Sequence, residues 1–280
     1  MSEGYILNAL QTPASMRPIY DAIDRGVANE DQLRSETGLS EKLFDQARAG
    51  LRLLRLVGRE NGDYYTADFA CDTGNRDLNF RLTALHNLAQ ECDPREWGKQ
   101  SVVLLVYEYL LENNIQYLEN NDRALYEDID DWYRQEQGYD PQSSQGSITL
   151  NEPKFVNWSR QAAYLGLIYK TNGREHAVRP DPELITASIG LAADDDGYVG
   201  LAEYVEWLNN NLIRVPLTPS GRIPTPHARS LDNLVRDGWI RLVERDDAGV
   251  VGPQNTTGPT GNTAAAHTTE LTLCTQNLQA

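Results

Sequence analysis

Long apolar runs are missing from this sequence of 280 residues. A transmembrane helix needs about 20 consecutive apolar residues, so we expect none here. The N-terminus lacks a basic segment followed by an apolar one, and therefore does not look like a secretory signal. These absences predict a cytoplasmic protein that makes no contact with a membrane.

Cysteine and other metal ligands are scarce. The three cysteines, Cys71, Cys92 and Cys274, are widely spaced and odd in number, which fits reduced thiols and excludes a disulfide framework or a cysteine-rich zinc site. The four histidines have no cysteine or carboxylate partner at ligand spacing. The stretch 194–197 begins like a calcium loop, but Val205 replaces the closing glutamate, so we interpret it as a solvated turn. We expect no metal and no cofactor.

Motifs of common enzymes are also missing. The sequence has no G-x-x-x-x-G-K-[ST] phosphate loop and no G-x-S-x-G nucleophile turn. One string is similar to part of a metal-dependent nuclease, with Asp140 followed by Glu152, Pro153 and Lys154. Pro153 disfavours a central strand and the next residues have helical periodicity, so we interpret residues 152–154 as a helix start. The sequence thus predicts a protein that is not an enzyme and has no catalytic residue.

Positive charge is in short supply. Asp and Glu number 41 against 25 Lys and Arg, which gives a formal net charge of −16. Phosphate contacts need local positive potential, so such a chain repels polyanions at long range. Acidic residues spread along the chain and basic residues that are almost all Arg are typical of a salt-saturated cytoplasm, such as that of a halophilic archaeon. There, salt at roughly 1 M screens repulsion within a few ångströms, so net charge is weak evidence against DNA binding. An acidic interaction protein that never touches DNA is the alternative.

What the sequence does contain is one pattern that occurs three times: an amphipathic helix, a Gly or Arg stop, a strand, a polar loop and a second strand. The predicted helices and strand pairs are 40–54 with 56–59 and 63–66, 151–165 with 167–170 and 177–179, and 225–237 with 239–243 and 270–273. A helix followed by a two-stranded wing is how winged helix-turn-helix domains end. We therefore predict a mainly α fold with small β wings (α+β), built from three tandem winged helix-turn-helix-like domains.

The three predicted domains differ in the segments that accompany the shared helix and wing. The first covers residues 1–70, and its 37–39 link is the turn of a helix-turn-helix. The second, residues 71–185, adds a helical extension in front of its helix and wing. The third, residues 186–280, has a long wing over 246–268 that is rich in Gly, Thr, Asn and Ala and is expected to be flexible.

Basic and amide side chains lie on the predicted outer face of each helix and in the wings. Such side chains reach base edges and phosphates in a major groove, although they also occur on ordinary solvated helices. The DNA-binding candidates are Lys42, Arg48, Arg52, Arg55 and Arg59 in the first copy, Lys154, Asn157, Arg160 and Arg174 in the second, and Arg229, Asn233 and Arg236 in the third.

Three stretches of the chain resemble a known family. They are Ile6-Leu7-Asn8-Ala9-Leu10-Gln11-Thr12-Pro13 ahead of the first copy, the central run from Leu150-Asn151 through Phe155-Val156-Asn157-Trp158 to Leu165-Gly166-Leu167, and the closing run from Ser230-Leu231-Asp232-Asn233-Leu234 to Asp237-Gly238-Trp239-Ile240. Together they are similar to the DpdG-type proteins, encoded in gene clusters that insert 7-deazaguanine bases into DNA and restrict unmodified DNA. The resemblance covers nearly the whole chain through short motifs. It implies an accessory, DNA-contacting subunit of a restriction system for antiviral defence, with no catalytic residue to carry over.

We accordingly expect two kinds of partner, double-stranded DNA and other subunits of a defence or DNA-processing complex. Two alternatives stay open. The chain is a protein-interaction scaffold that docks partners through the same faces, or it is a winged-helix transcription regulator, which usually needs only one module and often dimerises.

Overall fold

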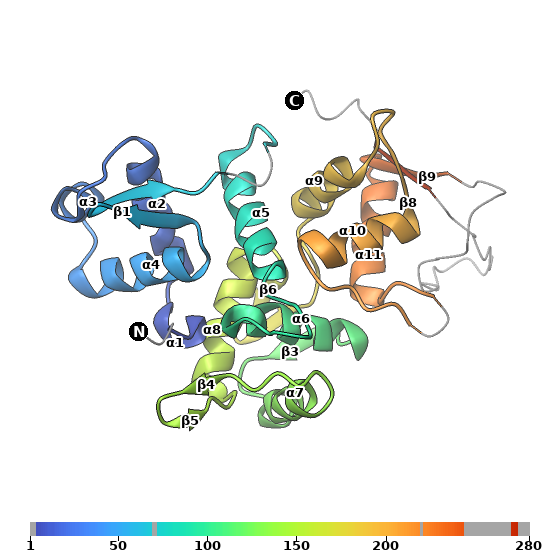
Figure 1. The fold of residues 1–280 in the computed structure, drawn as a ribbon. Coiled ribbons are helices and arrows are strands. Elements are labelled where there is room, and N and C mark those ends of the chain that lie inside the picture. The colour runs from blue at the N-terminus through green and yellow to red at the C-terminus, as the bar shows by residue number, and fades with distance from the viewer. Residues whose placement is uncertain (1–3, 69–71, 219–220, 244–269, 274–280) are drawn as a thin grey trace. The chain divides into compact units, whose positions relative to one another are not determined.

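The structure is a computed structural model that describes residues 4–68, 72–218, 221–243 and 270–273. Helices dominate it, and the strands form small sheets of two or three strands, which confirms the mainly α fold class (Figure 1). The chain divides into two units, residues 1–105 with 119–165 and residues 106–118 with 166–280. The predicted second domain is thus shared between the units. The tandem winged-helix arrangement itself stays a prediction.

The first unit contains most of the helices. Its elements in chain order are α1 (Ile6–Ala9), a 3₁₀ turn (Pro13–Ser15), α2 (Met16–Asp24), α3 (Glu30–Thr37), α4 (Glu41–Leu53), β1 (Val57–Glu60), β2 (Asp63–Thr66), α5 (Arg76–Ala89), a second 3₁₀ turn (Lys99–Ser101), α7 (Arg123–Gln135), β4 (Gln142–Ser143), β5 (Gly146–Ser147) and α8 (Glu152–Tyr164). The apolar helix α6 (Val102–Glu112) continues from this unit into the second.

The second unit combines the larger part of α6 and three further helices with two three-stranded sheets among its described residues. Its elements are β3 (Tyr117–Glu119), β6 (Tyr169–Asn172), β7 (Glu175–Ala177), α9 (Pro182–Ala192), β8 (Tyr198–Gly200), α10 (Leu201–Asn211), α11 (Thr225–Arg236), β9 (Ile240–Val243) and β10 (Glu270–Leu273). The sheet orders are β3-β7-β6 and β8-β10-β9. Helix α9 passes through the domain boundary predicted at 185/186.

The first helix-and-hairpin copy has the elements that the sequence predicts. Asn29 caps α3 by accepting a hydrogen bond from the Asp31 amide (2.9 Å), and Gly38 ends that helix with a positive φ of 60°. After α4, strands β1 and β2 pair around Asn61 and Gly62. Both residues have positive φ (52° and 98°), as a two-residue hairpin turn requires. The helix, strands and turn of the first copy are therefore confirmed.

The second copy has the predicted helix and a hairpin, but the two strands lie at 169–172 and 175–177, two residues from their predicted positions, and the copy does not form one module. Asn151 caps α8 through the Lys154 amide (3.2 Å), and Gly166, with φ of 82°, follows its end. Helix α8 belongs to the first unit, whereas its hairpin β6–β7 belongs to the second. The hairpin also gains a third strand, β3, which the sequence did not predict.

The third copy is confirmed in its helix and strand pair. Strands β9 and β10 pair antiparallel, with Ile240 opposite Leu273. Strand β8, which was not predicted, adds to the far side of β10. It follows the expected solvated turn, in which the Asp194 carboxylate accepts hydrogen bonds from the amides of Asp196 and Tyr198 (3.0 and 2.9 Å). The predicted flexible wing over 246–268 lies outside the described residues.

The composition led to expectations about membrane helices and about the cysteines, and the described residues address part of each. No helix in the described ranges combines the length and apolar character needed to cross a membrane. The Cys92 thiol donates to the Leu88 carbonyl (3.4 Å), one turn back in sequence. Cys71 and Cys274 lie outside the described residues.

A buried histidine on α11 makes the second unit sensitive to acid. Burial lowers the pKa of His227 to about 4, and its ring lies 6.3 Å from that of Tyr204. Below about pH 6.5 the unfolded chain takes up a proton that the folded chain refuses, so we expect stability to fall by up to about 3 kcal/mol on acidification to pH 4. Above that window His227 is neutral in both states. Unfolding measured from pH 7 to pH 4 should be less pH-dependent in His227→Leu than in the wild type; equal slopes would contradict the assignment.

Candidate nucleic-acid interface

The first copy presents most of its basic side chains on α4 and in the segment that follows. Lys42 and Arg52 are exposed on α4. From Gln46 to Arg59 the sequence contains four arginines and no carboxylate. Residues 4–68 as a whole carry eight basic and ten acidic side chains, so most of the chain's net charge of −16 lies elsewhere. This part of the chain is therefore close to neutral although the chain as a whole is acidic.

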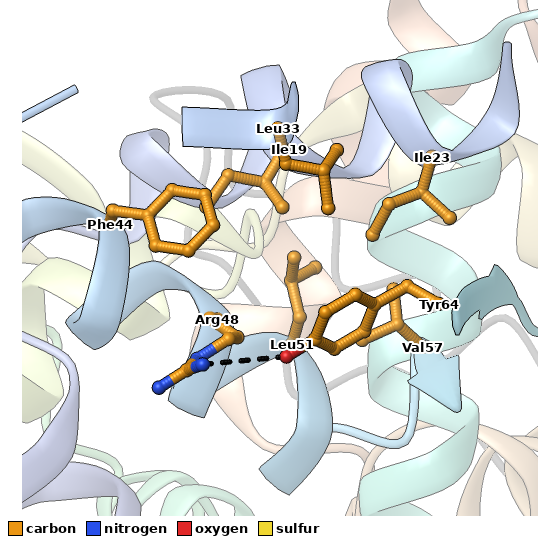
Figure 2. Close-up of a pocket in the computed structure, with 8 residues that line it drawn as sticks. All are labelled: Ile19, Ile23, Leu33, Phe44, Arg48, Leu51, Val57 and Tyr64. Carbon is orange, nitrogen blue, oxygen red and sulfur yellow. Dashed lines mark hydrogen bonds between the residues drawn. The ribbon is translucent and has the colours of Figure 1, made fainter. Parts of the chain in front are cut away.

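Arg48 does not face outward as the sequence predicted. Its guanidinium lies 2.6 Å from the Glu30 carboxylate, 3.3 Å from that of Asp45 and 3.4 Å from the Tyr64 hydroxyl. Burial alone would raise the pKa of Glu30, but Arg34 and Arg48 lower it below its usual range. Figure 2 shows Arg48 reaching Tyr64 along the apolar core of this copy. The prediction was wrong because Arg48 pairs with Glu30 in the first turn of α3. The spacing of residues on α4 alone gives no sign of this contact with another helix.

This arrangement separates two arginines that the sequence treats alike. We expect Arg48→Ala to lower the free energy of unfolding by about 1–2 kcal/mol, because Glu30 then loses a charged partner in a half-buried setting. Arg52→Ala, an exposed change on the same helix, should stay within about 0.5 kcal/mol. Denaturant unfolding of the two variants checks this. Similar stabilities would show that the ion pairs of Arg48 contribute nothing.

The segment after α4 and both described wing tips keep their arginines exposed. Arg55, which follows α4 with a positive φ of 53°, pairs with Glu91 (3.2 Å), yet 60% of its side chain remains exposed. Arg59 on β1 donates to the Gly62 carbonyl (3.0 Å), which orients its guanidinium along the hairpin tip. Arg174 is exposed next to the turn between β6 and β7. These three candidates occupy the surface positions that were predicted.

Asn157, by contrast, was wrongly placed on an outer face. It is buried, and its amide nitrogen donates to the Leu7 carbonyl (2.9 Å). Gln161, one turn further along α8, donates to the Ile6 and Leu10 carbonyls (3.3 and 3.1 Å). This face of α8 therefore holds the N-terminal helix α1, whose carbonyl groups need donors once water is excluded. The sequence did contain a signal for this contact: Asn157 and Gln161 carry side-chain amides four residues apart, next to the apolar stripe of the helix.

The other two candidates of the second copy differ in exposure: Lys154 is half-buried, whereas Arg160 is exposed. Lys154 is half-buried, its ammonium group donates to the Thr149 carbonyl (2.8 Å), and burial lowers its pKa. Arg160 is exposed and donates to the Asn157 side chain (3.3 Å). Of the predicted groove-facing set on α8, only Arg160 is exposed to solvent.

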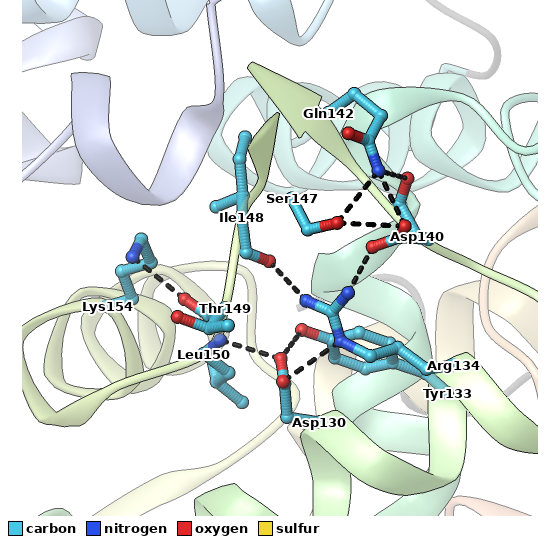
Figure 3. A network of polar contacts seen from close by, with 10 residues as sticks. All are labelled: Asp130, Tyr133, Arg134, Asp140, Gln142, Ser147, Ile148, Thr149, Leu150 and Lys154. Atoms are coloured by element: carbon cyan, nitrogen blue, oxygen red, sulfur yellow. Dashed lines mark hydrogen bonds and ion pairs between the residues drawn. The ribbon is translucent and has the colours of Figure 1, made fainter. Parts of the chain in front are cut away.

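The nuclease-like string is part of a structural network (Figure 3). The Asp140 carboxylate pairs with Arg134, whose Nη2 also donates to the Ile148 carbonyl (2.8 Å). Asp130 accepts from the Leu150 amide (2.7 Å) and from Arg134 Nε (3.0 Å). The network thus joins α7 to the strand-like segment that leads into α8. Residues 152–154 form the first turn of that helix, as predicted.

The described residues show no group of three or more His, Cys, Asp or Glu side chains placed to hold a metal ion.

The third copy exposes two arginines on α11. Arg229 donates to the Gln116 side chain beside β3, and Arg236 bonds to Asn233 and lies 3.7 Å from Asp237. Asn233 is half-buried. The candidates as a set do not converge on one site: Lys42, Arg48, Arg52, Arg55, Arg59, Lys154, Asn157 and Arg160 belong to the first unit, and Arg174, Arg229, Asn233 and Arg236 to the second.

No family model matches this chain. No curated protein matches it either. Two solved structures are similar to it, both of SspB, and one of them was determined with bound magnesium ion. Each is 12% identical to this chain with a TM-score of 0.43, over 98% of this chain and 83% or 84% of the SspB chain. A likeness at this level carries no argument about fold or function, and the DpdG-type resemblance stays a prediction.

Proposed function

We propose that residues 5–68 form a winged helix-turn-helix module that contacts duplex DNA, and that the chain acts as a non-catalytic, DNA-binding accessory subunit. The observation that carries the proposal is the run from Gln46 to Arg59, which has four arginines and no carboxylate. Three of those arginines, at 52, 55 and 59, are exposed. The run begins on a helix and ends on the hairpin that follows it.

The geometry of α3, α4 and the hairpin suits this role. Helix α4 has 13 residues, so it is about 20 Å long, and a major groove about 12 Å wide admits such a helix. Lys42 lies in its first turn and Arg52 in its last, so the two ends of the helix can meet phosphates on either side of the groove. Arg59 at the wing can contact a third phosphate.

The three copies then have different roles in this proposal. The first is the principal DNA contact. The third supplies a second contact through Arg229 and Arg236, which are exposed on α11. The face of α8 that carries Asn157 is occupied by α1, so the central copy is structural or serves a protein partner. That partner would be another subunit of the complex.

The assignment to a DNA modification and restriction system rests on the resemblance to DpdG-type proteins. It agrees with a chain whose catalytic motifs are missing and whose contacts are spread over separate basic surfaces. A restriction subunit needs affinity for DNA of any sequence more than it needs sequence preference. Arginine–phosphate contacts provide such sequence-independent affinity.

Binding of a labelled duplex, followed by fluorescence anisotropy, tests the proposal. We expect the double variant Lys42→Ala/Arg52→Ala to weaken association roughly tenfold at low salt, because two phosphate contacts are lost. The matched control is Arg123→Ala, which removes an exposed arginine that pairs with Glu127 on α7. It should bind within about twofold of the wild type.

The double variant removes two positive charges and the control one, so a control loss of half the size on a logarithmic scale would mean that only net charge matters and would contradict a defined interface. No association of the wild-type protein with duplex DNA would favour the scaffold alternative.

A further inference from the structure

The sheet β3-β7-β6 of the second unit carries two unusually exposed aromatic side chains. Tyr117 on β3 is 60% exposed and Tyr169 on β6 is 68% exposed. Among the large apolar and aromatic side chains of the described residues these two have the highest exposed fractions. Single exposed aromatic residues are common on protein surfaces, so their relation to each other decides whether they matter.

Both tyrosines lie on the solvent side of the same sheet. Ala177 on β7 is directly opposite Tyr169 in the register, so the two share a face. His176, the neighbour of Ala177, is buried on the other face, as is Leu118, the neighbour of Tyr117. Because side chains alternate along a strand, Tyr117 lies on the same face as Ala177.

The central strand leaves room between the two rings. Strand β7 lies between β3 and β6, and its residue opposite Tyr169 is Ala177. Two strand spacings separate the edge strands, which is about 10 Å. The two tyrosines therefore flank a small side chain, and most of each tyrosine is exposed to solvent.

Cationic side chains surround this face. Arg174 stands at the hairpin turn, and Arg179 is two residues beyond Ala177 and therefore points to the same side. Arg229 of α11 is held at the β3 edge by its bond to Gln116, the residue before Tyr117. Lys170 is also exposed on β6, but it lies opposite His176 in the register and therefore on the other face of the sheet.

Two carboxylates share this sheet. The Glu175 side chain accepts a hydrogen bond from the Thr171 hydroxyl (2.8 Å), and Glu119 is exposed at the end of β3. Three arginines thus lie on this face or at its edge against two carboxylates, a small excess of positive charge in a chain of net charge −16.

We propose that this sheet face binds single-stranded nucleic acid, with one base stacked on Tyr117, another on Tyr169, and the phosphates contacted by Arg174, Arg179 and Arg229. Paired open aromatic rings with cations beside them are the combination that single-strand-binding surfaces use, since every base has a π face. In a duplex those base faces are already covered by stacking, so the surface selects unpaired strands. The site lies in the second unit and does not depend on the duplex contact proposed for α4 in the first.

A 5′-fluorescein-labelled oligothymidine of about 12 nucleotides tests the site by anisotropy, using the full chain. We expect Tyr117→Ala and Tyr169→Ala each to weaken single-strand binding by about tenfold, because one base loses its stacking partner. Tyr117→Phe and Tyr169→Phe keep the ring and should bind within about twofold of the wild type. Tyr65→Ala on β2, at a tyrosine that is 52% exposed in the first unit, is the matched control and should have no effect.

The contribution of the arginines is tested separately, through the salt dependence of single-strand binding. Arg179→Ala should reduce the slope of log affinity against log salt by about one. Duplex binding should be the same in the tyrosine variants and the wild type. Loss of the α4 contact would weaken duplex binding, whereas loss of this site would weaken only single-strand binding, so the two failures are distinguishable. Absence of single-strand binding by the wild-type chain overturns the proposal, as does binding that the two alanine variants leave intact. Loss of binding in the phenylalanine variants equal to that in the alanine variants also overturns it, because stacking would not be the cause.

Discussion

Replacing Trp158 by Ala is expected to lower the free energy of unfolding by about 3–5 kcal/mol. Trp158 on α8 is fully buried and is among the largest such side chains of the described residues. Its ring stacks on Phe155 at 5.4 Å with an interplanar angle of 9°, and its indole nitrogen donates to the Val103 carbonyl (3.0 Å). The substitution removes a large apolar volume and also the hydrogen bond from the indole to the Val103 carbonyl, so the two losses add.

Guanidinium unfolding followed by circular dichroism measures this effect. Trp239→Ala is the matched control, because Trp239 is 40% exposed just before β9. We expect the control to cost less than about 1 kcal/mol. Comparable losses for the two tryptophans would show that α8 is not packed as described.

The second large effect concerns a buried ion pair in the second unit. Glu108 on α6 is buried and pairs with Arg214 in the segment after α10. Burial raises the pKa of Glu108, while Arg214 opposes that rise. Arg214→Met leaves the carboxylate buried without this partner, and we expect a loss of about 3–5 kcal/mol at pH 7.

The loss should depend on pH with a defined sign. Because the folded-state pKa of Glu108 lies above its unfolded value, the protonated form is favoured in the folded chain, and stability falls as pH rises through the folded pKa. Without Arg214 that pKa rises further. The deficit of Arg214→Met should therefore shrink as pH is lowered towards about 4.5.

A double variant provides the control for this pair. Glu108→Gln/Arg214→Met removes both charges and should recover most of the stability lost in Arg214→Met at pH 7, since no unpaired carboxylate remains. Thermal unfolding of the single and double variants at pH 7 and at about pH 4.5 gives the comparison. A deficit in Arg214→Met that does not change with pH would mean that Glu108 is not the cause.

The repeated helix-and-hairpin order could be predicted because its signals are local. Asn29, Gly38 and the Asn61-Gly62 pair each specify a cap or a turn through their own backbone preferences. Strands β3 and β8 could not be found in this way. Each is three residues long and pairs with a strand far away in sequence, so its neighbours in the chain carry no signal.

Long-range contacts also explain which site residues were misplaced. Arg48 is paired with Glu30, 18 residues earlier, and Asn157 with the Leu7 carbonyl, 150 residues earlier. Helical spacing alone assigns both to an outer face. Arg52, which lies one turn beyond Arg48, is exposed as predicted. Spacing thus identifies the side chains that leave the local apolar stripe, but not those that another segment covers.

The salt dependence of duplex binding tests the central claim most directly. Association of the full-length wild-type chain with several duplexes of different sequence should be measured from about 0.1 M to about 1 M potassium chloride. We predict that log affinity falls linearly with log salt concentration, with a similar slope and affinity for every duplex, because arginine–phosphate contacts dominate. A strong preference for one sequence would favour a transcription regulator over a restriction subunit. No salt-dependent association with any duplex would contradict the account.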